Sequence, residues 1–318
     1  MREIGPEIGH YSRMRLTNRP VLALSLAATL CVAGTSAQTP RDSLLVSTTW
    51  LGSHLNDANL VLLHVGDKTA YAAQHIKGAR AVTMGDLSVS GEEAGGLNLQ
   101  MLPVPVLHDR LVALGISNTS RIVVYSANPN VTSATRVVLT LDYAGLGDRA
   151  SLLDGGMAAW TKDGRELTNV VPEVKPGTLA PLTIRPIIVD AAFVKANLKT
   201  ANMAIVDARL TPFYDGTQIG GSPQAPHKTG HIEGAHNVPW SDLTTDSQTF
   251  KPAAELRDRF AQAGVKPGDT VVGYCHIGQQ ATAMIFAART LGFKVLLYDG
   301  SFEDWSKQPD APVSIIKK

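Results

Sequence analysis

Short apolar runs alternate with amphipathic stretches along most of the chain, most clearly after residue 200. The apolar runs predict strands at residues 204–206, 270–274 and 294–298. The amphipathic stretches predict helices at 253–263 and 280–291, each followed by a glycine. Strands that are separated by helices favour parallel pairing, with helices on both faces of the sheet. The pattern therefore predicts an α/β fold.

The same pattern occurs twice. Residues 45–51 and 58–66 recur 143 positions later as residues 188–194 and 201–209. Three further matches follow in order, pairing 75–79 with 231–235, 123–126 with 272–275, and Asp154 and Trp160 with Asp299 and Trp305. Ordered matches of this kind indicate an internal duplication.

The duplication predicts two domains, at residues 44–168 and 187–316. A chain of 318 residues is long enough for two domains of ordinary size. The segment 169–186 between them contains four prolines, which exclude a long helix. We interpret this segment as a linker.

Residues 1–37 are predicted to be a cleaved export signal. Three arginines (Arg13, Arg15 and Arg19) precede an apolar run at 21–34, and small residues precede a cut after Ala37. The run has 14 residues, whereas a membrane span needs about 20. The expected location is periplasmic or secreted, with no stable membrane association after cleavage.

Two features of this segment have alternatives. Cys31 raises the question of a lipid-attachment site, but Leu30 before it is bulky where a small residue is needed. We therefore assign Cys31 to the apolar part of the signal. The stretch before Arg13 is long for a signal, so that either Met1 or Met14 is the start.

Charge and composition exclude several partners. The chain has 29 basic and 28 acidic residues, for a net charge of +1, which gives no electrostatic case for nucleic acid or an anionic membrane. Hydrophobic residues make up 44% and aromatic residues 6%, which suits an α/β protein.

The second cysteine, Cys275, is the strongest chemical candidate. Once Cys31 leaves with the signal, Cys275 has no partner for an intramolecular disulfide in an oxidising compartment. It directly follows a predicted strand, at the edge of a parallel sheet where sites are found. The next residues lead into a helix, so that backbone N–H groups and the helix dipole stabilise a thiolate. A buried, inert thiol is the alternative.

From Leu45 to Ile315 the chain resembles the tandem-domain rhodaneses, the thiosulfate and 3-mercaptopyruvate sulfurtransferases. Three motifs carry the resemblance: GHIEGA at 230–235, YCHIG at 274–278, and YDGSF at 298–302 before Trp305. The resemblance implies two rhodanese-like domains, of which the second is catalytic and forms a persulfide on Cys275. The first domain is expected to be non-catalytic, because Ser126 replaces Cys275 there and Gly66 replaces Arg209.

The resemblance also implies the reaction. A small anionic sulfur donor gives its outer sulfur to the Cys275 thiolate, and cyanide or a thiol later accepts it, without a cofactor or a metal. Backbone N–H groups hold the negative charge; these belong to His276, Ile277, Gly278, Gln279 and Gln280. Arg209 is expected to bind the donor anion, with a surface ion pair as the alternative.

The donor is less well defined. Thiosulfate-preferring rhodaneses often have two basic residues after the cysteine, and 3-mercaptopyruvate-preferring relatives have small ones, whereas this chain has His276 and Ile277. We expect thiosulfate first and 3-mercaptopyruvate second. His276 could add positive charge at low pH, with solvent exposure as the alternative.

Three other interpretations were considered. Cysteine phosphatases use Cys-x5-Arg, but Ala281 stands at the arginine position. The spacing of His227, His231 and His236 suggests a metal site, but the repeat of His231 as His75 without such neighbours favours a structural role. A binding module or persulfide carrier stays open, and turnover of a small sulfur donor separates it from an enzyme.

Overall fold

The computed structural model describes residues 1–2, 5, 9–10 and 39–316 of the chain. The predicted export signal covers residues 1–37. Most of these residues, including Cys31 and Ala37 at the predicted cut, lie outside the described part of the chain. The signal and its cut therefore stay predictions. Among the described residues, no helix combines the length and the apolar character that a membrane crossing requires.

Each half of the chain contains one parallel five-stranded sheet, and the strand order is the same in both. In the first half (39–168) the order is β1-β7-β6-β2-β3, and in the second (187–316) it is β8-β15-β14-β9-β13. The strands are β1 Leu45–Val46, β2 Leu60–Val65, β3 Arg80–Val82, β6 Arg121–Ser126, β7 Ala150–Leu153, β8 Ile188–Val189, β9 Met203–Asp207, β13 His236–Asn237, β14 Thr270–Tyr274 and β15 Lys294–Tyr298. The predicted tandem α/β fold is confirmed.

Helices cover both faces of each sheet. The helices of the first half are α1 Pro40–Leu44, α2 Thr48–His54, α3 Lys68–Ala73, α4 Met84–Leu87, α5 Val104–Ala113, α6 Thr132–Tyr143 and α7 Gly156–Lys162. Those of the second half are α8 Ala191–Asn197, α9 Thr211–Tyr214, α10 Ala253–Gln262, α11 Gln280–Thr290 and α12 Ser301–Lys307. Short hairpins and bridges add β4 Ser88–Gly91 with β5 Leu97–Met101, β10 Gly221–Ser222 with β11 Ala225–Pro226, and β12 His231–Ile232 with β16 Val313–Ser314.

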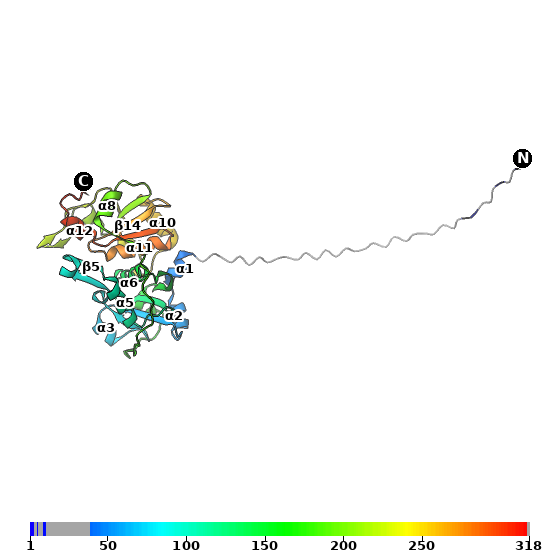
Figure 1. The fold of residues 1–318 in the computed structure, drawn as a ribbon, viewed down its shortest axis with the longest axis horizontal. Helices are drawn as coiled ribbons and strands as arrows, with labels where there is room; N and C mark the ends of the chain where they lie inside the picture. The colour runs from blue at the N-terminus through cyan, green and yellow to red at the C-terminus, as the bar shows by residue number, and fades with distance from the viewer. Residues whose placement is uncertain (3–4, 6–8, 11–38, 317–318) are drawn as a thin grey trace. The chain divides into compact units, whose positions relative to one another are not determined.

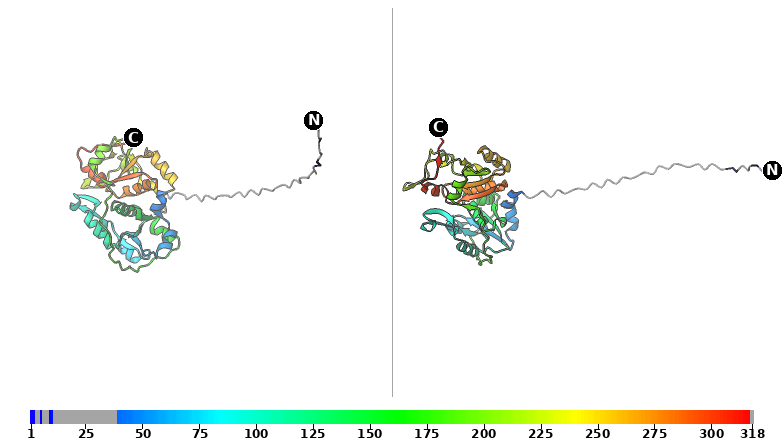
Figure 2. Two further views of the ribbon diagram at one scale, coloured as in Figure 1. Left: turned by 45° about the vertical axis from the view of Figure 1, so that its right-hand side comes forward. Right: turned by 45° about the horizontal axis from the view of Figure 1, so that its top comes forward.

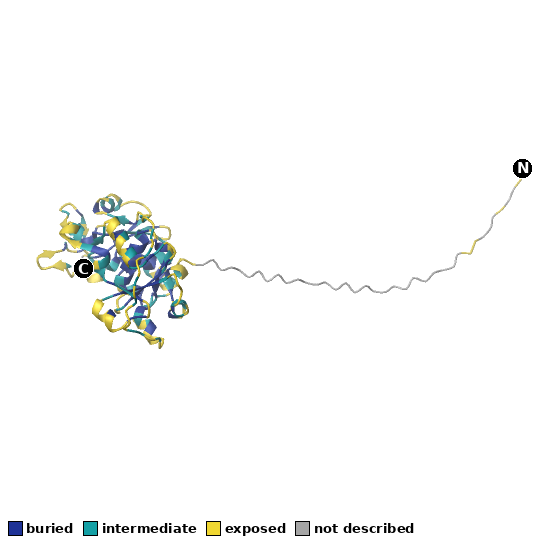
Figure 3. Ribbon diagram, turned by 60° about the horizontal axis from the view of Figure 1, so that its bottom comes forward, coloured by how far each residue is buried: buried dark blue, intermediate teal, exposed yellow. Residues whose placement is uncertain are grey.

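Successive side chains of a strand point to opposite faces of its sheet. In β14, Val271 belongs to a core that contains α10 and α11, whereas Val272 and Tyr274 belong to a second core that contains α8 and α12. Both faces are therefore buried, which explains why the strands appear as continuous apolar runs. Figure 3 shows the buried residues on the sheets and inner helices, with exposed residues on outer helices and loops.

The two halves meet along α6 and α11, which occupy equivalent positions in the repeat and lie side by side (Figures 1 and 2). Thr135 Oγ1 of α6 lies 2.8 Å from Thr282 Oγ1 of α11, and both residues are buried. One hydrophobic core includes residues of both halves, among them Leu111 and Ile285. The linker 169–186 contains neither helix nor strand.

Candidate active site

Cys275 directly follows β14, and residues 275–279 form the loop that leads into α11. We call this segment the cysteine loop. The sequence produces it because the apolar strand ends at Tyr274 and Gly278 then adopts a φ of +79°, which L residues with side chains rarely adopt. Cys275 is a free thiol with no exposed surface. The thiol is therefore shielded from solvent.

The backbone N–H groups of the cysteine loop are available to a ligand. The N–H of Cys275 donates to Ser301 Oγ at 3.2 Å. Within the described part of the chain, none of the N–H groups of residues 276–280 donates a hydrogen bond. Because buried N–H groups are almost always paired, a row of free ones at the start of a helix is suited to binding an anion.

The loop carbonyls point toward other elements. Cys275 O accepts from Phe302 N at 3.0 Å, and His276 O accepts from Glu303 N at 2.9 Å, both in the first turn of α12. Gly278 O accepts from Arg136 Nη1 at 3.1 Å. In a trans peptide the C=O and the following N–H point in opposite directions. The N–H groups of residues 276, 277 and 279 thus point away from these partners.

Arg209 lies two residues after the end of β9 and is buried, with 1% of its surface exposed. Its Nε lies 3.0 and 3.1 Å from the two carboxylate oxygens of Asp207, and its Nη2 donates to Asp207 Oδ2 at 2.5 Å and to Gly230 O at 2.8 Å. Its guanidinium carbon lies 3.9 Å from the centre of the Phe302 ring. Arg209 thus forms an ion pair, as the alternative expected, but the pair is buried and does not lie at the surface.

Arg209 stays charged, and its Nη1 is available to a ligand. Burial by itself lowers the pKa of Arg209, but the Asp207 carboxylate reverses this effect and raises the pKa, and Cys275 adds to the rise. Among the described residues, no group accepts a hydrogen bond from Nη1 of Arg209. A permanently charged donor therefore stays available close to the cysteine.

A pocket of about 520 Å³ opens beside the cysteine loop. Its lining residues come from the loop, from α9, from the β10–β11 hairpin and from both halves of the chain; they are Asn98, Phe213, Ile219, Gly220, Gly221, Ser222, Ala225, His227, His276, Ile277 and Glu303. The His276 ring meets the Phe213 ring edge-on at 4.7 Å and lies 5.7 Å from the His227 ring.

His276 is neutral in this setting. Burial, followed by the charge of Arg209 and the proximity of His227, lowers the pKa of His276 to about 4. The pKa of His227 is also lowered, chiefly by burial and then by Arg209. The positive charge expected of His276 at low pH would therefore require a pH below about 4.

The other predicted loop residues have distinct positions. Ile277 lines the pocket. A Cβ on Gly278 would lie 2.8 Å from Asp299 O, so that only glycine fits. The side chain of Gln279 donates to Thr132 Oγ1 and Ser133 Oγ of α6, at 3.1 and 2.9 Å. Gln280 is the first residue of α11. Because its side chain is held by α6, Gln279 can contact a sulfur donor only through its backbone N–H.

In the equivalent loop of the first half, carbonyl groups face Ser126, the residue that replaces the cysteine. Ser126 Oγ donates to the carbonyls of Asn128 and Asn130 at 2.8 and 2.7 Å, and Pro129 has no N–H to offer. A Cβ on Gly66 would lie 2.7 Å from the Ala127 Cβ, so that no arginine side chain fits there. Carbonyl groups that face Ser126 disfavour an anion, which agrees with a non-catalytic first half.

The repeated histidines support the backbone. His231 stacks on Tyr214 at 3.8 Å with Nδ1 2.7 Å from Tyr214 O, and His75 stacks on Tyr71 at 4.0 Å with the same Nδ1 distance to Tyr71 O. This agrees with the structural role inferred for the motif. Among the described residues, no cluster of three or more His, Cys, Asp or Glu side chains is arranged to hold a metal ion.

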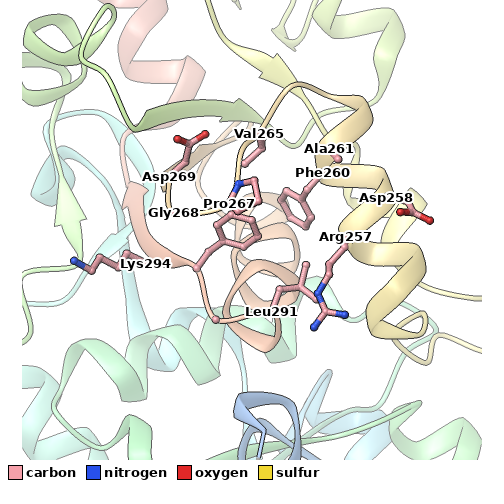
Figure 4. A pocket seen from close by; sticks show the side chains of 12 residues that line it. Arg257, Asp258, Phe260, Ala261, Val265, Pro267, Gly268, Asp269, Leu291 and Lys294 are labelled. Carbon is pink, nitrogen blue, oxygen red and sulfur yellow. The ribbon is translucent and has the colours of Figure 1, made fainter.

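A second pocket, of about 400 Å³, lies at the amino ends of β14 and β15, the opposite end of these strands from Cys275. Figure 4 shows the Phe260 ring turned into this pocket, with the side chains of Asp258 and Lys294 directed away from its centre. None of its lining residues is a cysteine, serine or histidine. It therefore offers no thiol or imidazole to accept a sulfur atom.

Each half of the chain matches the model of the rhodanese-like domain, over residues 47–163 and 190–308. The chain belongs to the rhodanese family. The two matches cover both sheets, and the second covers the cysteine loop.

Similar proteins of this family are sulfur-handling proteins by name. A protein of Pseudomonas aeruginosa assigned as a 3-mercaptopyruvate sulfurtransferase is 34% identical, over 77% of this chain and 85% of its own. The sulfur carrier protein TtuD of Thermus thermophilus is 30% identical, over 85% and 96%. A protein of Saccharopolyspora erythraea assigned as a thiosulfate sulfurtransferase is 30% identical, over 86% and 96%. These names support sulfurtransferase activity.

Solved structures show the same fold at lower identity. The crystal structure of YnjE matches with a TM-score of 0.79 and 23% identity, over 89% of this chain and 70% of that one. The wild-type structure of EanB matches with a TM-score of 0.77 and 23% identity, over 88% and 70%. At this identity the likeness shows the fold alone.

Two residues near the cysteine loop, Asp207 and Arg136, received no role in the sequence analysis, and His227 was interpreted there only from its spacing to His231 and His236. Asp207 could have been found, since an acidic residue two positions before a buried arginine at a strand end is a natural ion-pair partner. His227 stands in an irregular segment without a periodic pattern. Arg136 lies 142 residues from the loop that it contacts, and nothing local marks it.

Proposed function

We propose that the protein is a sulfurtransferase that carries a sulfane sulfur as a persulfide on Cys275. The observation that carries this proposal is the row of free N–H groups of residues 276–280 next to the only cysteine among the described residues. Such groups stabilise the negative charge of a thiolate or a persulfide. Membership of the rhodanese family and the names of the relatives support the same reaction class.

The reaction proceeds in two displacements. In the first, the Cys275 thiolate attacks the outer sulfur of thiosulfate, the S–S bond of the donor breaks, and sulfite leaves with the bonding electrons. In the second, cyanide or a thiolate attacks the outer persulfide sulfur, the new S–S bond breaks, and the Cys275 thiolate returns. Arg209 binds the donor anion through Nη1. His276, Ile277, Gly278, Gln279 and Gln280 contribute backbone N–H groups.

Thiosulfate is the preferred donor in this proposal and 3-mercaptopyruvate is second. Arg209 keeps its charge near Cys275, whereas both nearby histidines have lowered pKa values. One guanidinium suits one compact anion, whether a sulfonate-like or a carboxylate group. Relatives assigned to both donor classes support keeping both.

The decisive experiment is intact-mass measurement on protein that begins at residue 38, which contains Cys275 as its single cysteine. Incubation with thiosulfate or 3-mercaptopyruvate should add the mass of one sulfur atom, and excess cyanide should remove it. Cys275→Ser should abolish the addition, whereas Ser126→Ala, the matched change in the other half, should leave it intact. No added sulfur with either donor would overturn the proposal.

A non-enzymatic persulfide carrier is the second candidate, and the relative named as a sulfur carrier favours it. Many turnovers per chain with a small donor and cyanide support the enzyme. A single loading without turnover supports the carrier.

We also propose that residues 1–37 direct export and are removed after Ala37. The arginines, the apolar run and the small residues before Ala37 support this location. Expression of the full chain in a bacterium tests it. A periplasmic product that begins at Gln38 is expected, and a full-length product in the cytosolic fraction would contradict it.

A further inference from the structure

An arginine of the non-catalytic half reaches the cysteine loop. Arg136 belongs to α6 and is buried, with 1% of its surface exposed. Its Nη1 donates to Gly278 O at 3.1 Å and to Asp299 Oδ1 at 2.6 Å, and its Nη2 donates to Leu99 O. A single guanidinium thus joins a helix and a hairpin strand of the first half to two loops of the second.

Asp299, the partner of Arg136, is also held from the first half. Its Oδ2 accepts from Met101 N at 2.9 Å, and its carbonyl accepts from Gln100 Nε2 at 3.3 Å. Both carboxylate oxygens are therefore occupied by groups of the first half. The pair of Arg136 and Asp299 has no net charge, so its effect on the cysteine loop is orientation rather than added positive charge.

The contact with Gly278 determines where one N–H group points. The carbonyls of Cys275 and His276 are held by α12 of the same half, that of Gln279 is held by Thr282 of α11, and that of Gly278 is held by Arg136. Gly278 has a φ of +79° and no side chain, so its peptide plane rotates easily unless a partner holds it. Arg136 fixes that plane, and the N–H of Gln279 then points to the opposite side, away from Arg136.

We propose that Arg136 is a positioning residue for sulfur transfer, which orients the cysteine loop from the other half of the chain. This inference rests on the proposed function of Cys275. It gives the first half a role in the reaction although residues 39–168 contain no cysteine. Arg136 touches neither the donor nor Cys275, and it acts through the peptide of Gly278 and Gln279.

Variants of the pair test this role. Arg136→Met alone leaves Asp299 buried without a cation and is expected to lose stability. The double variant Arg136→Met, Asp299→Asn removes both charges, which keeps the fold accessible to measurement. Arg136→Lys retains the charge but not the planar fork that serves two acceptors at once. Arg149→Met is the matched control, because Arg149 also donates to a carbonyl of the first half, Ser117 O at 3.2 Å, away from the loop.

The measurements are kcat and KM for the donor, the pH dependence of alkylation of Cys275, and urea unfolding. The folded double variant should lose about 10- to 100-fold in kcat with little change in KM, because the N–H donor is misdirected but still present, and complete removal of one such donor costs about 100- to 1000-fold. Its alkylation should require higher pH, and Arg136→Lys should recover part of both losses. Arg149→Met should behave as wild type in the first two measurements.

Two outcomes separate this inference from the proposed function. A folded double variant with wild-type kcat and a wild-type alkylation profile would overturn the positioning role even if the wild type forms a persulfide. If the wild type forms no persulfide, the proposed function fails, and the alkylation profile still tests whether Arg136 orients the loop. An unshifted profile in that case would overturn the inference as well.

Discussion

At the scale of single residues, the site depends on buried charges that are paired before any substrate arrives. Asp207 and Arg209 are 0% and 1% exposed and form one such pair. A buried ion pair contributes little to stability, but the removal of one partner is costly because the other charge stays buried. The pairing fixes the direction of the guanidinium, so that its Nη1 can bind the anionic sulfur donor.

The buried pair predicts how Arg209 variants behave. Arg209→Met should destabilise the fold by roughly 3–5 kcal/mol, because Asp207 is left without a partner. The double variant Asp207→Asn, Arg209→Met should regain much of that stability but still lose roughly 10- to 100-fold in kcat/KM for an anionic donor. Urea unfolding and donor kinetics measure the two effects. Wild-type kcat/KM in the double variant would show that Arg209 does not bind the donor.

The neutral His276 predicts a pH dependence of stability. Burial and then Arg209 lower the pKa of His276 to about 4, below the ordinary value of 6.5. Between pH 6.5 and 4 the unfolded chain takes up a proton that the folded chain does not, so stability falls as the pH falls through this window. His276→Gln should remove at most about 3 kcal/mol of that loss. Urea unfolding at several pH values measures it, and identical slopes for variant and wild type would contradict it.

At the scale of elements, the two strand–loop–helix units have the same fold and opposite chemistry. In the first half the loop from Ser126 turns carbonyls toward the hydroxyl, and in the second the loop from Cys275 leaves its N–H groups free. The peptide planes of the two loops are oriented differently, and only the second loop contains a residue with positive φ, Gly278. A glycine in the left-handed region is therefore a sensitive point of the second loop.

Two glycines allow the effect of backbone strain to be distinguished from the effect of a steric clash. Gly278 and Gly292 have φ values of +79° and +88°, but a Cβ would meet Asp299 O at 2.8 Å only at Gly278, with nothing within 4 Å at Gly292. Gly278→Ala and Gly292→Ala should each lower the free energy of unfolding by about 1–2 kcal/mol, because alanine is strained at positive φ. Only Gly278→Ala should also lose about 10- to 100-fold in sulfur transfer. Equal losses of activity in both variants would show that the close contact at Gly278 is unimportant.

Strands were easier to predict from the sequence than contacts between halves. The strands at 270–274 and 294–298 were predicted to the residue, because a strand buried on both faces is a continuous apolar run. The helices end one residue earlier than predicted, at Gln262 and Thr290, each two residues before a glycine with positive φ. Cys275 and Arg209 could be proposed because each follows a strand.

Arg136 could not be predicted in the same way. An arginine in a helix is normally exposed, and its burial here results from the packing of α6 against α11. The direction of the loop carbonyls could not be predicted from the sequence either, since it depends on partners in α12 and in the other half. Sequence patterns predict local elements, whereas these features arise only when the repeats meet.

At the scale of the whole molecule, the halves share a hydrophobic core. One cluster of buried residues runs from Leu111 and Val138 of the first half to Phe260 and Ile285 of the second. Separate outer cores complete each half. Because the shared core is lost if either half unfolds alone, the halves should stabilise one another.

The shared core predicts a single cooperative unfolding transition. Calorimetry should give one peak, with equal calorimetric and van't Hoff enthalpies. Leu111→Ala, at a position with 0% exposure in the first half, should cost roughly 2–5 kcal/mol. Because both halves contribute to one transition, the whole peak should move down, by about 2–4 °C for each kcal/mol. If instead two peaks appear and only one of them moves, the halves unfold independently, and the shared core does not couple the loop of Cys275 to the half that holds Arg136.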